Sequence, residues 1–424
     1  MSALRGGHVE NLAQQARQAM AAGRLAEAAR IWGDVLAISP EHAQAHFHLG
    51  QHAVYLKQFG KARSLLERAA QLAPDDPAIP HSLSFIFRVQ GDKDAEMAAL
   101  ARALAIDAYF FPALLSKAML LERTGQKKAA AQVYKDALTI SPPDDQLTPA
   151  IRQSLQHGRE LARENLAALD AHLEARLVSA RTRHPGANLE RLEECKSVLA
   201  GSRKVYTQQP SMLHFPRLPA LQFYDNKDFP WIEKFESATD AMRQEFLRVF
   251  REDNGNFSPY VSHPAGAPLN QWAELNHSSR WSALYLWRDG NSVAENCARC
   301  PDTAAAVQAA PMLELPRLGP TALFSLLAPH TRIPAHTGST NVRLVLHLPL
   351  IVPPGCGFRV GNETREWEEG KAWVFDDTIE HEAWNGSDKL RVILIMDIWN
   401  PHLTLAERDL VSELLTGLRE FNGE

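Results

Sequence analysis

The first third of the chain repeats one pattern of small and bulky positions with a period of 34 residues. The small positions are Ala16, Gly50, Ser84 and Ala118. The bulky positions of the same units are Trp32, Leu66, Leu100 and Tyr134. Small residues let two helices approach closely, and a bulky residue fills the space beside them. The pattern therefore predicts pairs of packed helices over about residues 9–144.

Helix breakers keep the same phase as this pattern. They are Pro40, Pro74 and Pro142 after the second helices, and Gly23, Gly91 and Gly125 in the turns. Because several columns agree, the region resembles four tetratricopeptide repeats. The resemblance implies an α-solenoid over residues 1–145 with a groove for a peptide or protein; a spacer or dimerisation arm is the alternative. We expect helices within 146–204 to cap or link the array, because an uncapped solenoid exposes an apolar face.

The pattern changes after Ser202, where prolines and aromatic residues become frequent, so we place a domain boundary near residue 204. A helical stretch at about 231–251 precedes short apolar runs, partly alternating and separated by turn dipeptides. These runs span 282–287, 321–328, 341–352, 357–362, 372–377 and 389–399. Many short strands without intervening helices predict an antiparallel sandwich or barrel over 205–424, with a cupin-type jelly roll as the leading candidate. The expected fold class is α followed by mainly β.

Charge and cysteine content narrow the possible functions. A formal net charge of -5 gives no reason to expect nucleic acid as a partner. No run approaches the roughly 18 apolar residues that span a bilayer. Four cysteines are too few for a disulfide framework in a chain this long, so we expect a cytoplasmic protein. Cys297 and Cys300 form a single CxxC, whereas a structural zinc site normally needs a second ligand pair.

Histidines mark the candidate chemistry of the C-terminal half. His330 and His336 are expected in the loop before one strand, His347 lies within that strand, and His381 comes later. Non-heme iron oxygenases commonly use two histidines and one carboxylate, which leaves coordination positions open. The carboxylate usually stands two residues after the first histidine, but here that position is Gly338.

Two aspartates offer an alternative source for the missing carboxylate. Asp377 stands four residues before His381, which would place it on the same strand face, and Asp376 is its neighbour. We favour a supporting or turn role for both aspartates over direct metal ligation.

The segments PHTRIPAHTGSTNVRLVLHLPLIVPPGC (329–356) and GNETREWEEGKAWVFDDTIEHEAWNGSDKLRVILIMDIWNP (361–401) closely resemble the catalytic core of the aspartyl/asparaginyl β-hydroxylase family. The resemblance extends over about 205–405 and includes WSALYLWRDG at 281–290. Vertebrate-type members also have His-Thr-Gly and hold iron with two histidines alone. The resemblance to this family implies a double-stranded β-helix domain that uses Fe(II), 2-oxoglutarate and O2, with ascorbate helpful in vitro.

The same resemblance implies roles for individual residues. His336 and His381 become the iron ligands. Arg391 matches the arginine that holds the distal carboxylate of 2-oxoglutarate, for which a guanidinium is well suited. Ser325 corresponds to a hydroxyl that assists this arginine.

Further matches concern the two ends of the expected pocket. His347 matches a histidine beside the carboxylate next to the keto group. Trp287 is a candidate for the same pocket, and a place in the apolar core is the favoured alternative for this side chain. Arg343 matches one basic residue of the substrate subsite. Val345 departs from the pattern, because the better-known relatives have an arginine there. This departure puts an aspartate side chain as substrate in doubt.

The expected reaction is hydroxylation of an unactivated C–H, with succinate and CO2 as co-products. The expected target is the β-carbon of an Asp- or Asn-type residue in a peptide or protein that the repeats help to select. One alternative keeps the chemistry and changes the substrate to a lipid acyl chain or a free or carrier-bound amino acid. Another alternative is a non-catalytic binding module in which the repeats carry the function.

Overall fold

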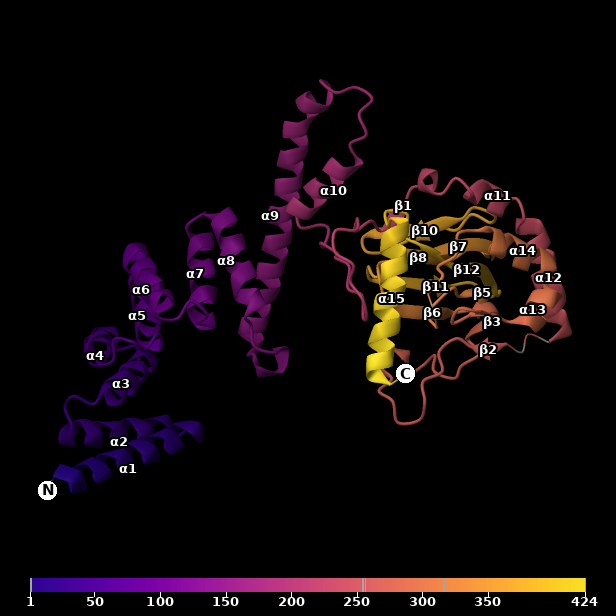
Figure 1. Cartoon of the computed structure of the whole chain (residues 1–424). Coiled ribbons are helices and arrows are strands. Elements are labelled where there is room, and N and C mark those ends of the chain that lie inside the picture. The colour runs from indigo at the N-terminus through magenta and orange to yellow at the C-terminus, as the bar shows by residue number, and fades with distance from the viewer. Residues whose placement is uncertain (1, 254, 256, 316, 424) are drawn as a thin grey trace. The chain divides into compact units, whose positions relative to one another are not determined.

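The structure is a computed structural model that describes residues 2–253, 255, 257–315 and 317–423, with side chains from residue 6 onward (Figure 1). It divides into two compact units, Met1–Ser202 and Arg203–Glu424. None of the helices in the described part of the chain is long and apolar enough to cross a membrane.

The first unit is an array of helices that stack in chain order (Figure 1). The helices are α1 (Ser2–Ala21), α2 (Leu25–Ile38), α3 (Ala43–Tyr55), α4 (Phe59–Leu72), α5 (Ala78–Gln90), α6 (Lys93–Ile106), α7 (Phe111–Arg123), α8 (Lys127–Thr139), α9 (Pro149–Arg181) and α10 (Glu190–Leu199). Each odd-numbered helix up to α7 pairs with the next one.

The contact between small and bulky positions explains the 34-residue period. A Cβ added to Gly50 would lie 2.7 Å from the Cγ of Leu66, so only glycine fits this helix crossing. The long helix α9 packs on α8 in the same manner, because Gly158 lies against the ring of Tyr134. Leu155 and Leu161 of α9 are buried beside it and cover the apolar end of the last repeat.

The second unit contains two antiparallel sheets. Its strands are β1 (Phe223–Tyr224), β2 (Ser258–Pro259), β3 (Trp281–Arg288), β4 (Asn291–Ser292), β5 (Ala322–Leu327), β6 (Thr331–His336), β7 (Arg343–Ile351), β8 (Cys356–Val360), β9 (Glu363–Arg365), β10 (Trp373–Phe375), β11 (His381–Asn385) and β12 (Arg391–Trp399). The larger sheet has the order β1-β10-β7-β12-β5-β3-β2, with β4 paired to β3, and the smaller has the order β6-β11-β8-β9. The helical region followed by an antiparallel sheet domain confirms the expected fold class, and the two sheets are consistent with a jelly roll.

Helices also contribute to this unit. They are α11 (Ile232–Glu236), α12 (Thr239–Glu252), α13 (Ala294–Arg299), α14 (Pro301–Ala309) and α15 (Leu405–Asn422). Figure 1 shows α12, α13 and α14 together beside the sheets. The stretch expected as one helix at 231–251 is therefore two helices, α11 and α12, and α13 to α15 lay outside the sequence-based expectation.

Alternation of side chains along β12 separates the two faces of the larger sheet. On β12, Val392, Leu394, Met396 and Ile398 enter an apolar core together with residues of α12 and α14. The residues between them face the smaller sheet, where Phe358 and Ala383 belong to a second apolar cluster. Because successive side chains of a strand point to opposite faces, one strand supplies both the core and the space between the sheets.

Glu245 of α12 fixes the start of α14. Its buried carboxylate accepts hydrogen bonds from the backbone N–H groups of Asp302 (2.8 Å) and Thr303 (2.9 Å) and from the Thr303 hydroxyl (2.6 Å). The Glu245→Ala substitution should lower the free energy of unfolding of this unit by about 2–3 kcal/mol, because buried donors lose their acceptor. Urea denaturation followed by tryptophan fluorescence measures this loss of stability, since eight of the nine tryptophans lie in this unit.

Asp240 of the same helix provides the matched control. Its side chain is 91% exposed and pairs with Arg243 at the surface. The Asp240→Ala substitution should change the free energy of unfolding by less than about 1 kcal/mol. Equal losses for the two variants would contradict the role of Glu245.

Candidate active site

A cavity of about 450 Å³ lies between the two sheets. The larger sheet lines it through β3, β5, β7 and β12, and the smaller sheet through β6, β8 and β11. Six of the seven residues to which the resemblance assigns a role meet here, although they come from five strands: His336, His381, Arg391, Ser325, His347 and Arg343.

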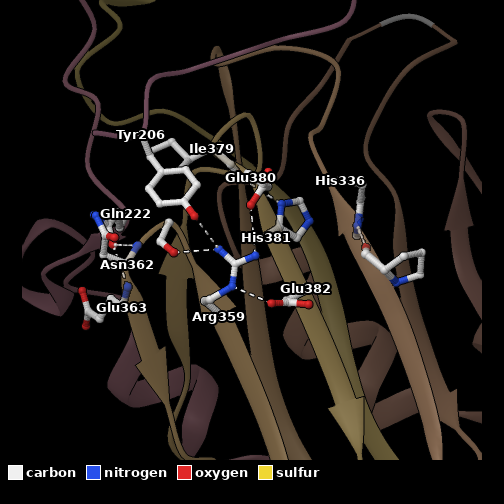
Figure 2. A network of polar contacts seen from close by, with 12 residues as sticks. Tyr206, Gln222, His336, Arg359, Asn362, Glu363, Ile379, Glu380, His381 and Glu382 are labelled. Carbon is white, nitrogen blue, oxygen red and sulfur yellow. Dashed lines mark hydrogen bonds and ion pairs between the residues drawn. The ribbon is translucent and has the colours of Figure 1, made fainter. Parts of the chain in front are cut away.

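His336 and His381 lie side by side on the smaller sheet (Figure 2). They are paired in register, and their ring centroids are 4.1 Å apart. His336 ends β6 and so lies on a strand, which corrects the expectation of a loop. The segment holds Pro334, which lacks an N–H, but β6 is an edge strand of the smaller sheet, where proline is tolerated.

Hydrogen bonds to the backbone fix the tautomers of both imidazoles. The Nδ1 atom of His336 lies 2.8 Å from the carbonyl oxygen of Pro334, and that of His381 lies 3.0 Å from the carbonyl oxygen of Ile379. A carbonyl oxygen can only accept, so each Nδ1 carries the hydrogen and each Nε2 keeps its lone pair. Burial lowers the pKa of His336 and lowers that of His381 further, which keeps both rings neutral. Neutral imidazoles held in this way fit a divalent metal ion.

An ion-pair network on the smaller sheet holds the strand of His381 (Figure 2). Arg359 of β8 donates to Glu382 (2.6 Å) and to Glu380 (3.0 Å), the two residues that flank His381. Tyr206 lies over the same guanidinium, with its hydroxyl 3.4 Å from Nη1. Because both neighbours of His381 are anchored in this way, its backbone is held on two sides.

No third ligand joins the two histidines among the described residues, because no group of three or more His, Cys, Asp and Glu side chains is arranged around a metal position. Asp377 instead forms an ion pair with Arg343. A Cβ added to Gly338 would overlap the carboxylate of Asp377, so the aspartate fills the space that a side chain at position 338 would need. The glycine of the His-Thr-Gly sequence is therefore a packing requirement.

The two aspartates lie in the turn between β10 and β11, and this corrects the expectation that Asp377 shares a strand face with His381. The Asp376 carboxylate accepts from the backbone N–H of Thr378 (2.9 Å) and from its hydroxyl (2.6 Å). This short-range pattern is that of a turn-forming aspartate.

Arg391 is a buried cation without a described carboxylate partner. Its exposed fraction is 1%, and its hydrogen bond from Nη2 goes to the hydroxyl of Ser325 at 3.3 Å, while Nε has no partner among the described residues. Burial lowers its pKa to about 10, which leaves it charged at neutral pH. A buried charge without a counter-ion is strongly unfavourable, so the site is built for an anion.

Ser325 completes this end of the cavity. Its oxygen accepts from Arg391 and from Nε1 of Trp281 at 3.1 Å, so its own hydrogen remains available to a ligand. His347 lies on β7, which pairs with the strand of Arg391. Its ring is stacked on Trp367, and its Nδ1 has no hydrogen-bond partner among the described residues. Burial, and next the charge of Arg391, hold the pKa of His347 well below its ordinary value, so the ring is neutral.

Trp287 is not among the described residues that line the cavity, which corrects the expected role of this side chain. It packs against the apolar core on the far face of the larger sheet. The cause is a bulge in β3 between Tyr285 and Trp287, which places Trp287 opposite Ala322 and reverses the alternation that starts at Trp281. Trp281 itself lines the cavity, and so does Trp272, whose ring lies edge-on to His336.

Arg343 lies at the other end of the cavity and is already paired. It binds Asp377, and its Nη1 lies 3.7 Å from Oδ2 of Asp397 on β12. The sequence reasoning missed Asp397, although its position on β12, six residues after Arg391, gives it the same inward direction.

Comparisons with known proteins find matches to both units. The sequence model described as aspartyl/asparaginyl beta-hydroxylase matches residues 236–401, and two tetratricopeptide repeat models match residues 19–83 and 111–144. The mouse aspartyl/asparaginyl beta-hydroxylase is 35% identical over 178 residues, which are 42% of this chain and 22% of that protein. The ornithine lipid ester-linked acyl 2-hydroxylase of Rhizobium tropici is 36% identical over 193 residues, which are 45% of this chain and 64% of that protein.

The chain therefore spans about a fifth of the mouse relative and less than two thirds of the rhizobial one. Among solved structures, a thermophilic tetratricopeptide protein of Thermus thermophilus is 19% identical, with a TM-score of 0.32, and the match covers 45% of this chain and 99% of that one.

The second unit is thus a sheet domain of the hydroxylase class, and the first is a helical repeat array. More particularly, residues 236–401 form an aspartyl/asparaginyl beta-hydroxylase domain that follows tetratricopeptide repeats, and the resemblance seen in the sequence is confirmed.

The Gly338→Ala substitution tests the packing of Asp377 against the His-Thr-Gly turn. The added methyl group must displace Asp377 and with it the ion pair to Arg343, so the free energy of unfolding should fall by about 2–4 kcal/mol. Thermal or urea unfolding of the full chain measures this loss.

Gly417 of α15 offers a matched control, because a Cβ added there meets nothing within 4 Å. The Gly417→Ala substitution should be neutral or should stabilise by up to about 1 kcal/mol, since alanine favours a helix. A Gly338→Ala protein as stable as the parent would show that the carboxylate does not occupy this space.

Proposed function

We propose that this chain is an Fe(II)- and 2-oxoglutarate-dependent hydroxylase whose substrate is an Asp- or Asn-type residue in a peptide or protein. The observation that carries the proposal is the buried guanidinium of Arg391, which has no carboxylate partner among the described residues. A planar carboxylate fits a guanidinium through two parallel hydrogen bonds, and a dicarboxylate such as 2-oxoglutarate supplies one at its distal end.

The donor set fits Fe(II). His336 and His381 present Nε2 lone pairs from neighbouring strands, and two protein ligands leave coordination positions open for a cosubstrate and O2. When bound, Fe(II) with 2-oxoglutarate and O2 supplies the oxidation of an unactivated C–H, and succinate and CO2 are the co-products.

The protein's own residues orient and shield the reactants. Arg391 would hold the distal carboxylate of 2-oxoglutarate, and Ser325 would donate its hydroxyl hydrogen to the same group. The neutral His347, close to Arg391, would contact the cosubstrate from β7. Apolar side chains such as Ile393 and Phe375 line the remaining wall and exclude water from the reacting carbon.

The first unit would recruit the substrate. The first helices of neighbouring repeats contact one another, as α3 and α5 do, and together they present exposed apolar side chains. Tyr55 is 70% exposed, and Phe85 and Val89 are 44% and 48% exposed. Such side chains suit a peptide segment in a groove, because tetratricopeptide arrays present extended concave binding surfaces.

A second candidate keeps this chemistry and replaces the peptide with a lipid acyl chain or a free or carrier-bound amino acid. The rhizobial relative, whose name describes acyl 2-hydroxylation, favours the lipid, and so does the apolar middle of the cavity. Measuring 2-oxoglutarate turnover with a panel of peptides and with a panel of lipids separates the two candidates, because the true substrate class should stimulate turnover.

The His381→Ala variant tests the proposed metal site. Succinate formation from 2-oxoglutarate, with Fe(II) and ascorbate, should fall by at least about 10²-fold, because one of only two protein ligands is lost. His330→Ala is the matched control, since His330 has a 65% exposed side chain and pairs with Asp388 at the surface. Succinate formation that survives His381→Ala, or that both variants lose equally, would contradict the assignment.

The Phe85→Glu and Val89→Glu double variant tests recruitment by the repeats. It should reduce oxidation of protein substrates in a cell extract, measured as a mass gain of one oxygen atom, because charge replaces the exposed apolar surface. Oxidation of short peptides should remain unchanged, since they do not need the groove. A double variant that matches the parent on proteins would favour a spacer role for the array.

A further inference from the structure

The cavity has two chemically different ends. Arg391 and Asp397 both point inward from β12 and are six residues apart, which corresponds to roughly 20 Å along a strand. Arg391 lies at one end with Ser325. The opposite end, called here the Arg343 end, is formed by Arg343, Asp377 and Asp397.

The Arg343 end holds no spare positive charge. Arg343 binds the carboxylate of Asp377 and lies 3.7 Å from that of Asp397, so one cation faces two acids. All three side chains are mostly buried, with exposed fractions of 19% for Arg343, 7% for Asp377 and 6% for Asp397. The three side chains together carry a charge of minus one when Asp397 is ionised and of zero when it is protonated. A substrate carboxylate placed here would be buried without a counter-ion.

The neighbouring residues on β7 and β12 are uncharged. Val345 is the next inward-pointing residue of β7 after Arg343, it is buried, and it lines the cavity. Ile395 stands on the neighbouring strand β12 and is apolar as well. The phenol of Tyr260 also lines the cavity, and burial raises its pKa, so this group is neutral too.

Two buried atoms at this end lack partners among the described residues. They are Nε of Arg343, a donor, and Oδ1 of Asp377, an acceptor. A carboxamide offers one acceptor and two donors, and so matches an end that presents both a donor, Arg343, and acceptors, Asp377 and Asp397. A carboxylate offers acceptors only and would face Asp377 unpaired, whereas an ammonium group offers donors only and would leave the arginine nitrogen without an acceptor.

We propose that the Arg343 end selects a target side chain that ends in a carboxamide and rejects one that ends in a carboxylate. The enzyme would thus act on asparagine-type residues and discriminate against aspartate. This inference rests on the proposed function. It adds that the enzyme accepts asparagine and rejects aspartate, although the two side chains are nearly isosteric. Val345 is the residue that sets this preference, because it keeps the wall beside Arg343 uncharged.

Two degenerate peptide libraries test the preference. They are identical except that the central residue is Asn in one and Asp in the other. The full-length protein is incubated with each library, Fe(II), 2-oxoglutarate and ascorbate, and mass spectrometry measures the rate at which the peptides gain one oxygen atom. The Asn library should gain oxygen at least about tenfold faster, because an unpaired carboxylate is excluded from a buried site.

The Val345→Arg variant adds a second guanidinium to the same wall. It should shift the ratio of the two rates toward the Asp library by roughly tenfold or more, because the Arg343 end then gains a free positive charge. Val345→Gln is the matched control, with similar length and no charge, and should leave the preference for Asn in place.

The outcomes separate this inference from the proposed function. Faster oxidation of the Asp library by the parent protein, or an unchanged ratio in Val345→Arg, would overturn the inference. Oxygen gain in neither library, by a protein that binds Fe(II) and 2-oxoglutarate, would also overturn it and leave the proposed function standing. A protein that neither binds nor turns over 2-oxoglutarate would contradict the proposed function and, with it, the inference.

Discussion

The guanidinium of Arg391 is a cation enclosed between two sheets, with a single serine hydroxyl as its described hydrogen-bond partner and the ring centroid of Trp367 5.7 Å away. Desolvation of such a charge is costly, and nothing in the described part of the chain offsets it with a carboxylate. The apolar core on the other face of β12, formed by residues such as Leu394 and Met396, has to hold this strand in place against that cost. The structure is therefore organised to keep a site ready for an anion, and the geometry of the cavity follows from this requirement.

Alternation along β12 connects this cation to the rest of the site. The same strand that places Arg391 at one end places Asp397 at the other, and between them stand two isoleucines. The neighbouring strand β7 repeats the arrangement with His347 and Arg343. The two histidines face these strands from the smaller sheet, so one sandwich gives the proposed anion-binding end, the proposed metal-binding wall and an Arg343 end of different charge.

The sequence predicted the features that depend on regular spacing. The helical repeats follow from a 34-residue period, and the strands of the larger sheet follow from long apolar runs such as β12. Prediction from the sequence failed where the local pattern is weak, or where the contact that fixes the structure comes from a distant part of the chain. The edge strand β6 contains Pro334, the bulge in β3 turns Trp287 to the far face, and Gly338 is explained by an aspartate 39 residues later. Each of these errors concerns a residue at or beside the site, where packing between distant segments decides the geometry.

The central claim is that Arg391 binds the distal carboxylate of 2-oxoglutarate. The most direct measurement compares the binding of 2-oxoglutarate with that of 2-oxopentanoate, in which a methyl group replaces this carboxylate, by calorimetry with Mn(II) under anaerobic conditions. The parent protein should prefer 2-oxoglutarate by about 10²-fold, and Arg391→Met should lose most of this preference, whereas the surface variant Arg288→Ala should keep it. Equal affinity of the parent protein for both acids, or an unchanged preference in Arg391→Met, would contradict the account.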